Sequence, residues 1–445
     1  MESLDRWMEH QYRHSAAAMM LSISSEVVKV RPGFAQTVKP RRGSIVASPV
    51  PGAYDPEPDY FFHWYRDSAV VIDALRVLSE DAGIDCNAPA HFADFVNFSL
   101  SLQALDGRAL SNSRAWRDAI APDYRQFVRT DEDLAAAHDG AIAAETRVNP
   151  DGTLDLSKWP RPQHDGPSMR ALTLLRWLRS GRIVAGRDAA LEKSVDALLR
   201  ADLDYTQRHW RESCFDIWEE EKGLHYYTLR VAAAALDAGA GWCEQRSESA
   251  DALAHRAAAA EILGMLDGYW REDLQFYRSR VLDCNAPSAK ELDISVIFAA
   301  LHAAGTGATH SVRDPRMHAT LERLEMLFDA EYAINRDRAG RAPAMGRYAG
   351  DVYYSGGAYY FSTLAAAEFC FRAAALSQGP AQRALIERGD AFVATVRAFT
   401  PPGGDLSEQF DQRTGVPRSA QQLAWSYAAF ITCVEARRRL IPRSA

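Results

Sequence analysis

The chain has 445 residues, a formal net charge of -8 at pH 7, 47% apolar residues and 25% charged residues. Such a composition is ordinary for a globular protein with a large core. The negative charge argues against a nucleic acid partner, because phosphate binding needs a basic surface. It fits a neutral or cationic ligand. The 6 cysteines include no Cys-x-x-Cys pair, so we expect buried thiols rather than disulfides or metal ligands.

The N-terminal residues carry charges of both signs and lack the basic region of a signal peptide. No apolar stretch is long enough to cross a bilayer. We therefore expect a cytoplasmic protein without membrane contact. No linker divides the sequence, which predicts one domain over residues 1–445. The Pro-rich residues 25–60 are expected to form a loop and strand segment packed on that domain.

Helical periodicity dominates the chain, and apolar stripes at Val71, Leu75, Leu78 and at Leu172, Leu175, Leu178 predict two helices. Gly239 is expected to cap an Ala-rich helix, and Gly379-Pro380 to end the helix over 357–378. Short strands are expected at 27–30, 44–48 and 148–156. Further helices are expected over approximately residues 4–22, 91–105, 187–207, 247–265, 293–304, 313–328, 382–399 and 421–440.

About a dozen helices with few strands predict an all-α protein. A helical solenoid would need a sequence repeat of fixed period, and the sequence has none. A closed toroid of paired helices buries the same apolar faces. In such a toroid the loops at one end converge on a single pocket, and the candidate motifs all lie in or beside loops at helix starts.

The first motif, Tyr60 to Asp67, reads Tyr-Phe-Phe-His-Trp-Tyr-Arg-Asp. Arg66 offers a fork of donors and Asp67 a pair of acceptors, which together suit two sugar hydroxyls. The alternative is that Asp67 only caps the following helix and forms a surface ion pair.

The second motif runs from Trp159 to Pro167. Asp165 suits an N-cap and Pro167 the first helical turn, so we assign Asp165 a structural role. Trp159 and Arg161 precede the helix and have no capping role, which makes them better ligand candidates.

The third motif runs from Phe215 to Glu221 and places Trp218 directly before three glutamates. An indole face suits the flat side of a sugar ring. Desolvation beside it would favour the protonated form of a neighbouring carboxyl, as a general acid requires. The alternative is a solvated acidic run at a helix start. Glu408 supplies a second carboxylate, and glycosidic-bond hydrolysis needs two in different environments.

Two further motifs complete the set. Arg347-Tyr348 and the Tyr- and Gly-rich residues 351–357 have the composition of a binding loop or of a turn. Glu408 lies in Ser-Glu-Gln-Phe, with Trp-Ser-Tyr following at 425–427. The histidines show no metal-ligand spacing, and no phosphate-binding Gly-rich loop is present. We therefore predict no metal and no cofactor.

The order of these motifs along residues 49–437 resembles glycoside hydrolase family 15, the glucoamylases. The resemblance implies an (α/α)6 toroid of about twelve helices with short β pieces near the N-terminus. It implies an exo-acting, anomer-inverting α-glucosidase that takes an oligosaccharide substrate. The expected product is β-glucose, released from the non-reducing ends of α-1,4-linked gluco-oligosaccharides.

Carried over by position, the resemblance makes Glu219 the general acid and Glu408 the general base. It implies that Trp64, Arg66 and Asp67 hold the terminal glucose, and that Glu220 binds the leaving sugar. The other substrate-site residues that the resemblance implies are Tyr60, Trp159, Arg347, Tyr359 and Gln409. Trp218, from the third motif, joins them as a predicted substrate contact. In that set Arg347 bridges the two sugars, Trp159 packs near the acid, and Tyr60 and Gln409 support the base and its water.

Three positions depart from the family pattern. Pro160 replaces a usual glycine, Tyr359 replaces the tryptophan platform of fungal members, and Glu221 adds a third acid. All three concern the leaving side, so linkage stays open. An α-1,6-specific relative (glucodextranase or isomaltose glucohydrolase) and a trehalase-like enzyme are the alternatives. A non-catalytic sugar sensor would have lost one of the two carboxylates, and a phosphorolytic enzyme would lack the base.

Overall fold

The structure is a computed structural model that describes residues 2–52, 57–81, 83–84, 86–183, 188–304 and 307–441. Residue 187 of the predicted 187–207 helix and residues 53–56 of the predicted 25–60 segment lie outside this part. Within it, no helix combines the length and the apolar character that crossing a bilayer requires.

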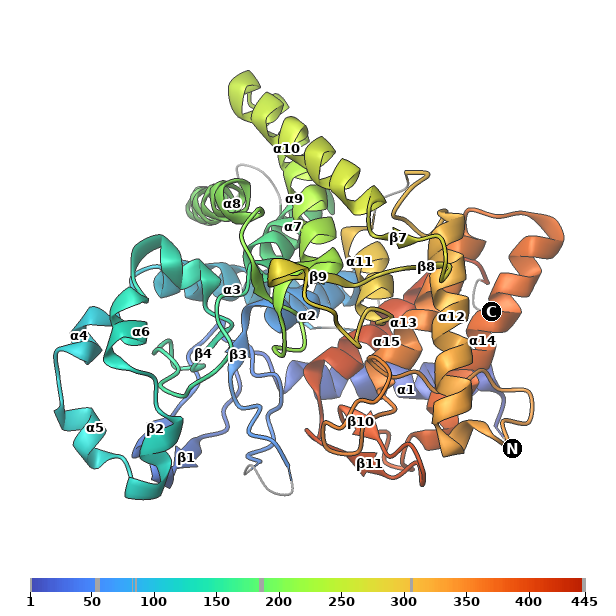
Figure 1. The fold of residues 1–445 in the computed structure, drawn as a ribbon, viewed down its shortest axis with the longest axis horizontal. Helices are drawn as coiled ribbons and strands as arrows, with labels where there is room; N and C mark the ends of the chain where they lie inside the picture. Colours follow the sequence, from blue (N-terminus) through green and yellow to red (C-terminus); the bar gives the residue numbers. More distant parts are fainter. Residues whose placement is uncertain are drawn as a thin grey trace.

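Six helices form an inner ring in which each packs against the next and the last closes against the first (Figure 1). Closure depends on the contact between the last helix of the ring and the first. In chain order the inner helices are α2 (Tyr65–Leu78), α7 (Asp165–Arg179), α9 (Tyr226–Glu244), α11 (Ser295–Ala303), α13 (Tyr360–Ala374) and α15 (Ala424–Arg438).

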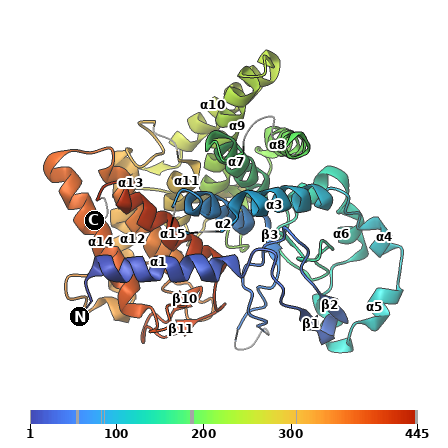
Figure 2. The ribbon, with the colours of Figure 1, turned by 180° about the vertical axis from the view of Figure 1, so that it is seen from behind.

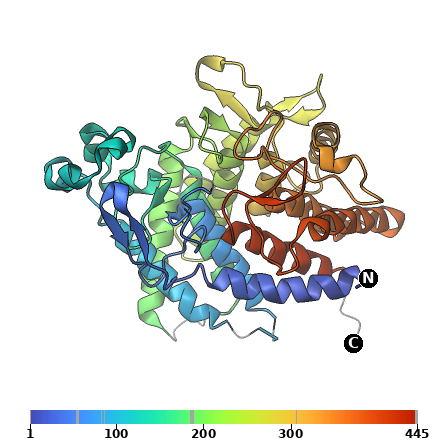
Figure 3. The same ribbon diagram turned by 90° about the horizontal axis from the view of Figure 1, so that it is seen from below.

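Each inner helix has an outer partner, and α1 takes that place beside α15 (Figures 2 and 3). The outer helices are α1 (Leu4–Met20), α3 (Ala88–Leu102), α8 (Ala189–His209), α10 (Ser249–Asp267), α12 (Pro315–Glu331) and α14 (Gly379–Phe399). A closed ring of six helix pairs is the (α/α)6 toroid, so the predicted fold class is confirmed.

Burial separates the two rings. In α13 every residue except Arg372 is buried, as expected for a helix with apolar neighbours on all sides. The outer helix α10 buries one stripe at spacings of three and four, through Ala252, His255, Ala259, Ile262 and Leu266. Its other face is solvated, and the helix projects beyond the rest of the molecule (Figures 1 and 2).

Short strands and helices fill the connections. The strands pair antiparallel as β1 (Lys29–Arg31) with β2 (Gln36–Val38), β3 (His63–Trp64) with β4 (Arg147–Val148), β5 (Cys214–Phe215) with β6 (Lys222–His225) and β6 with β9 (Arg280–Leu282), β7 (Trp270–Arg271) with β8 (Phe276–Tyr277), and β10 (Gln409–Phe410) with β11 (Pro417–Arg418). The short helices α4 (Arg108–Ser111), α5 (Ala115–Ala119) and α6 (Asp131–Ala136) form a lobe at one side (Figure 1).

Several local predictions were wrong. Gly239 lies inside α9, where a Cβ would stand 2.7 Å from Leu203 Cδ2, so its lack of a side chain allows α8 and α9 to pack closely. Gly379-Pro380 opens α14 instead of closing the preceding helix, because proline suits a first helical turn. The predicted strand at 44–48 forms only an isolated bridge, between Ile45 and Ile23.

A substitution at Trp177 tests the packing between the inner and outer rings of helices. Its ring is fully buried and stacks on Phe92 of α3, with centroids 4.5 Å apart, and its Nε1 donates to the carbonyl of Ile72 in α2 (3.0 Å). We expect Trp177→Ala to reduce the free energy of unfolding by about 3–5 kcal/mol, because it leaves a large cavity between the two rings of helices. Urea denaturation measures this. Leu253→Ala, at a site 72% exposed, is the control and should stay within about 0.5 kcal/mol of the parent.

Candidate active site

A cavity of about 230 Å³ lies where the N-terminal ends of the inner helices meet. All of the predicted site residues except Tyr359 and Gln409 line it. Its wall is formed by Ala47, Tyr60, Trp64, Arg66, Asp67, Trp159, Pro160, Ile217, Trp218, Glu219, Glu220, Arg347, Tyr353, Phe361, Glu408, Leu423 and Trp425. Segments from distant parts of the sequence therefore converge on one small pocket, as the toroid predicts.

Glu219 lies in a tight turn between β5 and β6 and has a left-handed backbone (φ 67°). The carboxylate of Asp216 fixes this turn by accepting hydrogen bonds from the backbone N–H groups of Glu220 and Glu221, both at 2.8 Å. Glutamate is not favoured in this conformation, and such positions cluster at functional sites. The alternative of a solvated acidic run at a helix start is therefore wrong.

The carboxylate of Glu219 is held between two indoles. Its Oε1 accepts from Trp64 Nε1 at 2.8 Å, and its Oε2 accepts from Trp159 Nε1. Burial raises the pKa of Glu219 above its ordinary value, although the charges of Arg66 and Arg147 oppose that shift. Desolvation therefore favours the protonated carboxyl that was predicted. The indole N–H donors of Trp64 and Trp159 lower the pKa and so act against burial, and Trp218, the predicted neighbour, donates to Asp293 at 2.9 Å instead.

Glu408 precedes β10, and hydroxyl groups surround its carboxylate. Tyr60 donates to its Oε1 at 3.1 Å, and Ser419 donates to its Oε2. The Tyr60 hydroxyl is also 2.9 Å from that of Tyr353. Burial raises the pKa of Glu408 to about 7, against the lowering effect of Ser419, Arg347 and Tyr60. Near neutral pH this carboxyl can change its protonation state.

A buried polar cluster forms the floor of the cavity. Arg66 lies 3.1 Å from Asp165, 3.4 Å from Asp67 and 3.5 Å from Glu219. Within the described residues, Arg66 Nε and Asp67 Oδ2 have no hydrogen-bond partner. Buried polar groups nearly always have one, so the hydrogen bonding of this cluster is incomplete beside the cavity, with Asp67 Oδ2 held by the 3.4 Å contact to Arg66.

Two structural interpretations from the sequence were wrong at this point. Asp165 is the first residue of α7 and not its N-cap; its carboxylate pairs with Arg66. Arg161, proposed as a ligand contact, is directed away from the cavity into ion pairs with Glu145 (2.6 Å) and Asp155 (3.2 Å). None of these three partners was apparent from the sequence, because all of them lie outside the second motif.

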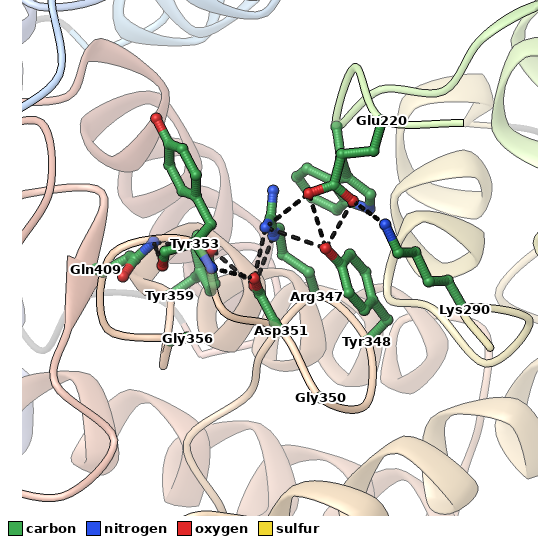
Figure 4. Close-up of polar contacts among 12 residues, drawn as sticks. Glu220, Lys290, Arg347, Tyr348, Gly350, Asp351, Tyr353, Gly356, Tyr359 and Gln409 are labelled. Atoms are coloured by element: carbon green, nitrogen blue, oxygen red, sulfur yellow. Dashed lines mark hydrogen bonds and ion pairs between the residues drawn. The ribbon is translucent and has the colours of Figure 1, made fainter. Parts of the chain in front are cut away.

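Tyr359 and Gln409 form a layer behind the wall of the cavity (Figure 4). Tyr359 is fully buried, and its hydroxyl donates to Asp351 Oδ2 at 2.8 Å while accepting from Gln409 Nε2 at 2.8 Å. Asp351 in turn holds Arg347 through contacts of 2.6 Å. Neither side chain lines the cavity, and both support the arginine that does. That the two residues take part in substrate binding stays a prediction.

Sequence reasoning also missed several residues. Tyr353 and Trp425 stood in the quoted motifs without a role, and Phe361 stacks on Trp218 with ring centroids 6.2 Å apart. Ser419 and Lys290 contact Glu408 and Glu220 but carried no sequence signal. A lone serine or lysine cannot be distinguished from a surface residue without the fold.

The fold and the pocket, with its two buried carboxylates, define a carbohydrate-cleaving enzyme, and comparison with known proteins supports this class. The sequence matches the family model of glycosyl hydrolases family 15 over residues 143–388 and 377–435, more than half of the chain. The chain belongs to this family and is a glycoside hydrolase.

Its relatives are similarly described. Glucoamylase-1 of Schizophyllum commune is 26% identical over 441 residues, which cover 90% of this chain and 70% of the relative. A probable glucoamylase of Schizosaccharomyces pombe is 25% identical over 473 residues, which cover 97% of this chain and 91% of the relative. The family 15 glucoamylase from Hypocrea jecorina has the same fold, with a TM-score of 0.79 and 24% identity over 99% of this chain and 74% of that one.

The raised pKa of Glu408 makes stability depend on pH. Between its ordinary value of 4.5 and about 7, the folded state binds more protons than the unfolded state, so this carboxyl lowers stability as pH rises. Glu408→Gln removes that dependence. We expect its Tm, relative to the parent, to be about 2–4 °C higher at pH 8 than at pH 5.

Thermal unfolding of both proteins at the two pH values tests this expectation. Exposed Glu132→Gln serves as the matched control and should show no such difference. A Glu408→Gln effect of equal size at both pH values would mean that the carboxyl is not perturbed.

Proposed function

We propose that this protein is an exo-acting, anomer-inverting glycoside hydrolase that releases β-glucose from the non-reducing ends of α-1,4-linked gluco-oligosaccharides. One observation supports the proposal above all: two buried carboxylates from distant segments face a single small cavity with different hydrogen-bond donors. The family and the glucoamylase relatives point the same way.

Glu219 is the general acid in this proposal. Its protonated oxygen gives the proton to the glycosidic oxygen as the bond to the sugar breaks, and its other oxygen keeps an indole N–H donor. Arg66 at 3.5 Å stabilises the carboxylate that forms. A positioned acid contributes about 10²–10⁴-fold to rate.

Glu408 is the general base. Tyr60 and Ser419 orient its carboxylate and leave acceptor capacity for a water molecule, which attacks the sugar from the face opposite the leaving group. The attack inverts the anomeric carbon. Asp67 and Arg66 supply an acceptor and a donor for the hydroxyls of the terminal sugar, and Arg347 reaches toward the leaving side.

A pair of variants tests these roles. We expect Glu219→Gln and Glu408→Gln each to lower kcat by about 10²–10⁴-fold, with circular dichroism unchanged and with near-normal rates for exposed Glu132→Gln. The substrates are maltose, isomaltose, trehalose and maltotetraose, and ¹H NMR follows the anomer first released. Maltotetraose reads the anomer unambiguously, because its leaving group is maltotriose, and α-glucose as the first glucose released from it would contradict inversion.

The same assay decides linkage. Isomaltose or trehalose as the best substrate would replace the α-1,4 proposal with one of the other two linkages. No turnover of any of them would favour a sugar-binding role. Cleavage inside the cell, as a cytoplasmic enzyme, stays a prediction that fractionation would check.

The assignment of Glu408 as the base also predicts how kcat/KM depends on pH. Ser419 donates to the ionised form of Glu408, so Ser419→Ala should raise the pKa of Glu408 further. Because the base must be ionised, the acid limb of kcat/KM should move upward by about 0.5–1 pH unit. A pH–rate profile with maltose measures this. An unmoved or lowered acid limb would assign that limb to another group.

A further inference from the structure

The segment between β9 and α11 places Lys290 beside Glu220, a residue of the cavity wall. Ser288 in this segment donates to Glu221 Oε2 at 2.8 Å, and the carbonyl of Lys290 accepts from Ser279 Oγ at 2.8 Å. Arg280 Nη1 donates to the same oxygen of Glu221 at 2.9 Å. These bonds fix the backbone of Lys290, so its side chain starts from a defined position.

Lys290 contacts the glutamate next to the proposed acid (Figure 4). Its Nζ donates to Glu220 Oε2 at 2.7 Å and stands 4.7 Å from the centre of the Tyr348 ring. The two charged side chains are 23% and 25% exposed. An ion pair this exposed contributes only about 0–1 kcal/mol to stability, so stability alone does not account for it.

Glu220 is already well supplied with donors. Its Oε1 accepts from Arg347 at 3.2 Å and lies 2.8 Å from the Tyr348 hydroxyl, while its Oε2 takes the Lys290 bond. A carboxylate has about four acceptor positions, and these three donors occupy most of them. A leaving sugar therefore finds little free acceptor capacity on Glu220 itself.

Lys290 has the capacity that Glu220 lacks. An ammonium group has three N–H donors, and one is directed to Glu220. Lys290 does not itself line the cavity, but Glu220 does, and the ammonium group lies 2.7 Å from Glu220 Oε2. In the proposed function Glu220 faces the leaving sugar, so a donor held by Glu220 lies next to that sugar. The charges nearby balance, since Lys290 and Arg347 face Glu220 and Asp351, which suits an uncharged sugar.

We propose that Lys290 is a specificity-determining residue that donates a hydrogen bond directly to a hydroxyl oxygen of the leaving sugar, with Glu220 and Tyr348 fixing its direction. This inference rests on the proposed function. It also gives Glu221 a role: it pairs with Arg280 and Ser288 to hold the segment that carries the lysine.

The test compares two leaving groups. α-Glucosyl fluoride has no leaving sugar, so the ratio of kcat/KM for maltose to kcat/KM for α-glucosyl fluoride reports the leaving side alone. We expect Lys290→Met to lower this ratio about tenfold, and Lys290→Arg to recover part of it. Lys222→Met, an exposed lysine on β6, is the control and should keep the parent ratio. An unchanged ratio in Lys290→Met would overturn the proposal.

A double-mutant cycle separates direct binding from positioning of Glu220. In a Glu220→Gln background, Lys290→Met should still lower the ratio if the lysine touches the sugar. No further loss would mean that Lys290 acts only through Glu220, which contradicts the proposal. Failure of the proposed function has a different signature: the parent would then hydrolyse neither maltose nor α-glucosyl fluoride. If isomaltose proves the better substrate, it replaces maltose in the ratio.

Discussion

The site depends on one short turn, from Asp216 to Glu221, which directs three consecutive glutamates to three different sets of partners. Asp216 makes this possible, because its buried carboxylate accepts two backbone N–H groups and lies 3.4 Å from Arg280. Burial alone would raise the pKa of Asp216, but Arg280 and the N–H groups outweigh it and keep the pKa low. An ionised anchor therefore holds the turn while the next carboxyl along the chain can stay protonated.

The two carboxyls of the cavity differ in their donors more than in their burial. Indole N–H groups and a nearby guanidinium surround Glu219, whereas hydroxyl groups surround Glu408. Hydroxyls can rotate and can also accept, so they adapt to a carboxyl that takes up a proton and releases it. Indoles only donate. In the proposed mechanism the fixed donors thus lie beside Glu219, the group that is left as a carboxylate after the bond breaks.

Much of the fold followed from the sequence, because inner and outer helices carry different apolar patterns that a period of 3.6 residues makes visible. Gly239 and Gly379 were misassigned for one reason: a glycine marks an unusual backbone or a close approach, and only the three-dimensional neighbours show which. The strands around Glu219 were missed because segments of two to four residues contain no period.

At the site, motif positions predicted which residues line the cavity, but not what each contacts. Asp165, Arg161 and Tyr359 all differ from expectation for the same reason, since each contacts a residue of another segment: Arg66, Glu145 and Gln409 respectively. Lys290 illustrates the limit most clearly. Its importance follows from Glu220, 70 positions away, and from a segment that other ion pairs hold in place.

The arrangement of the inner helices also affects the pKa values of the two carboxyls in the cavity. Inner helices direct their N-terminal ends toward the cavity, and helix N-termini favour negative charge. That field alone would keep both carboxyls ionised. Yet the pKa values of Glu219 and Glu408 are both raised, with burial the largest cause. Burial in the small cavity therefore acts against the field of the helices at both carboxyls. In the proposed mechanism this burial favours the protonated form that the acid needs, so the narrow pocket serves the chemistry as well as shaping the space for one sugar.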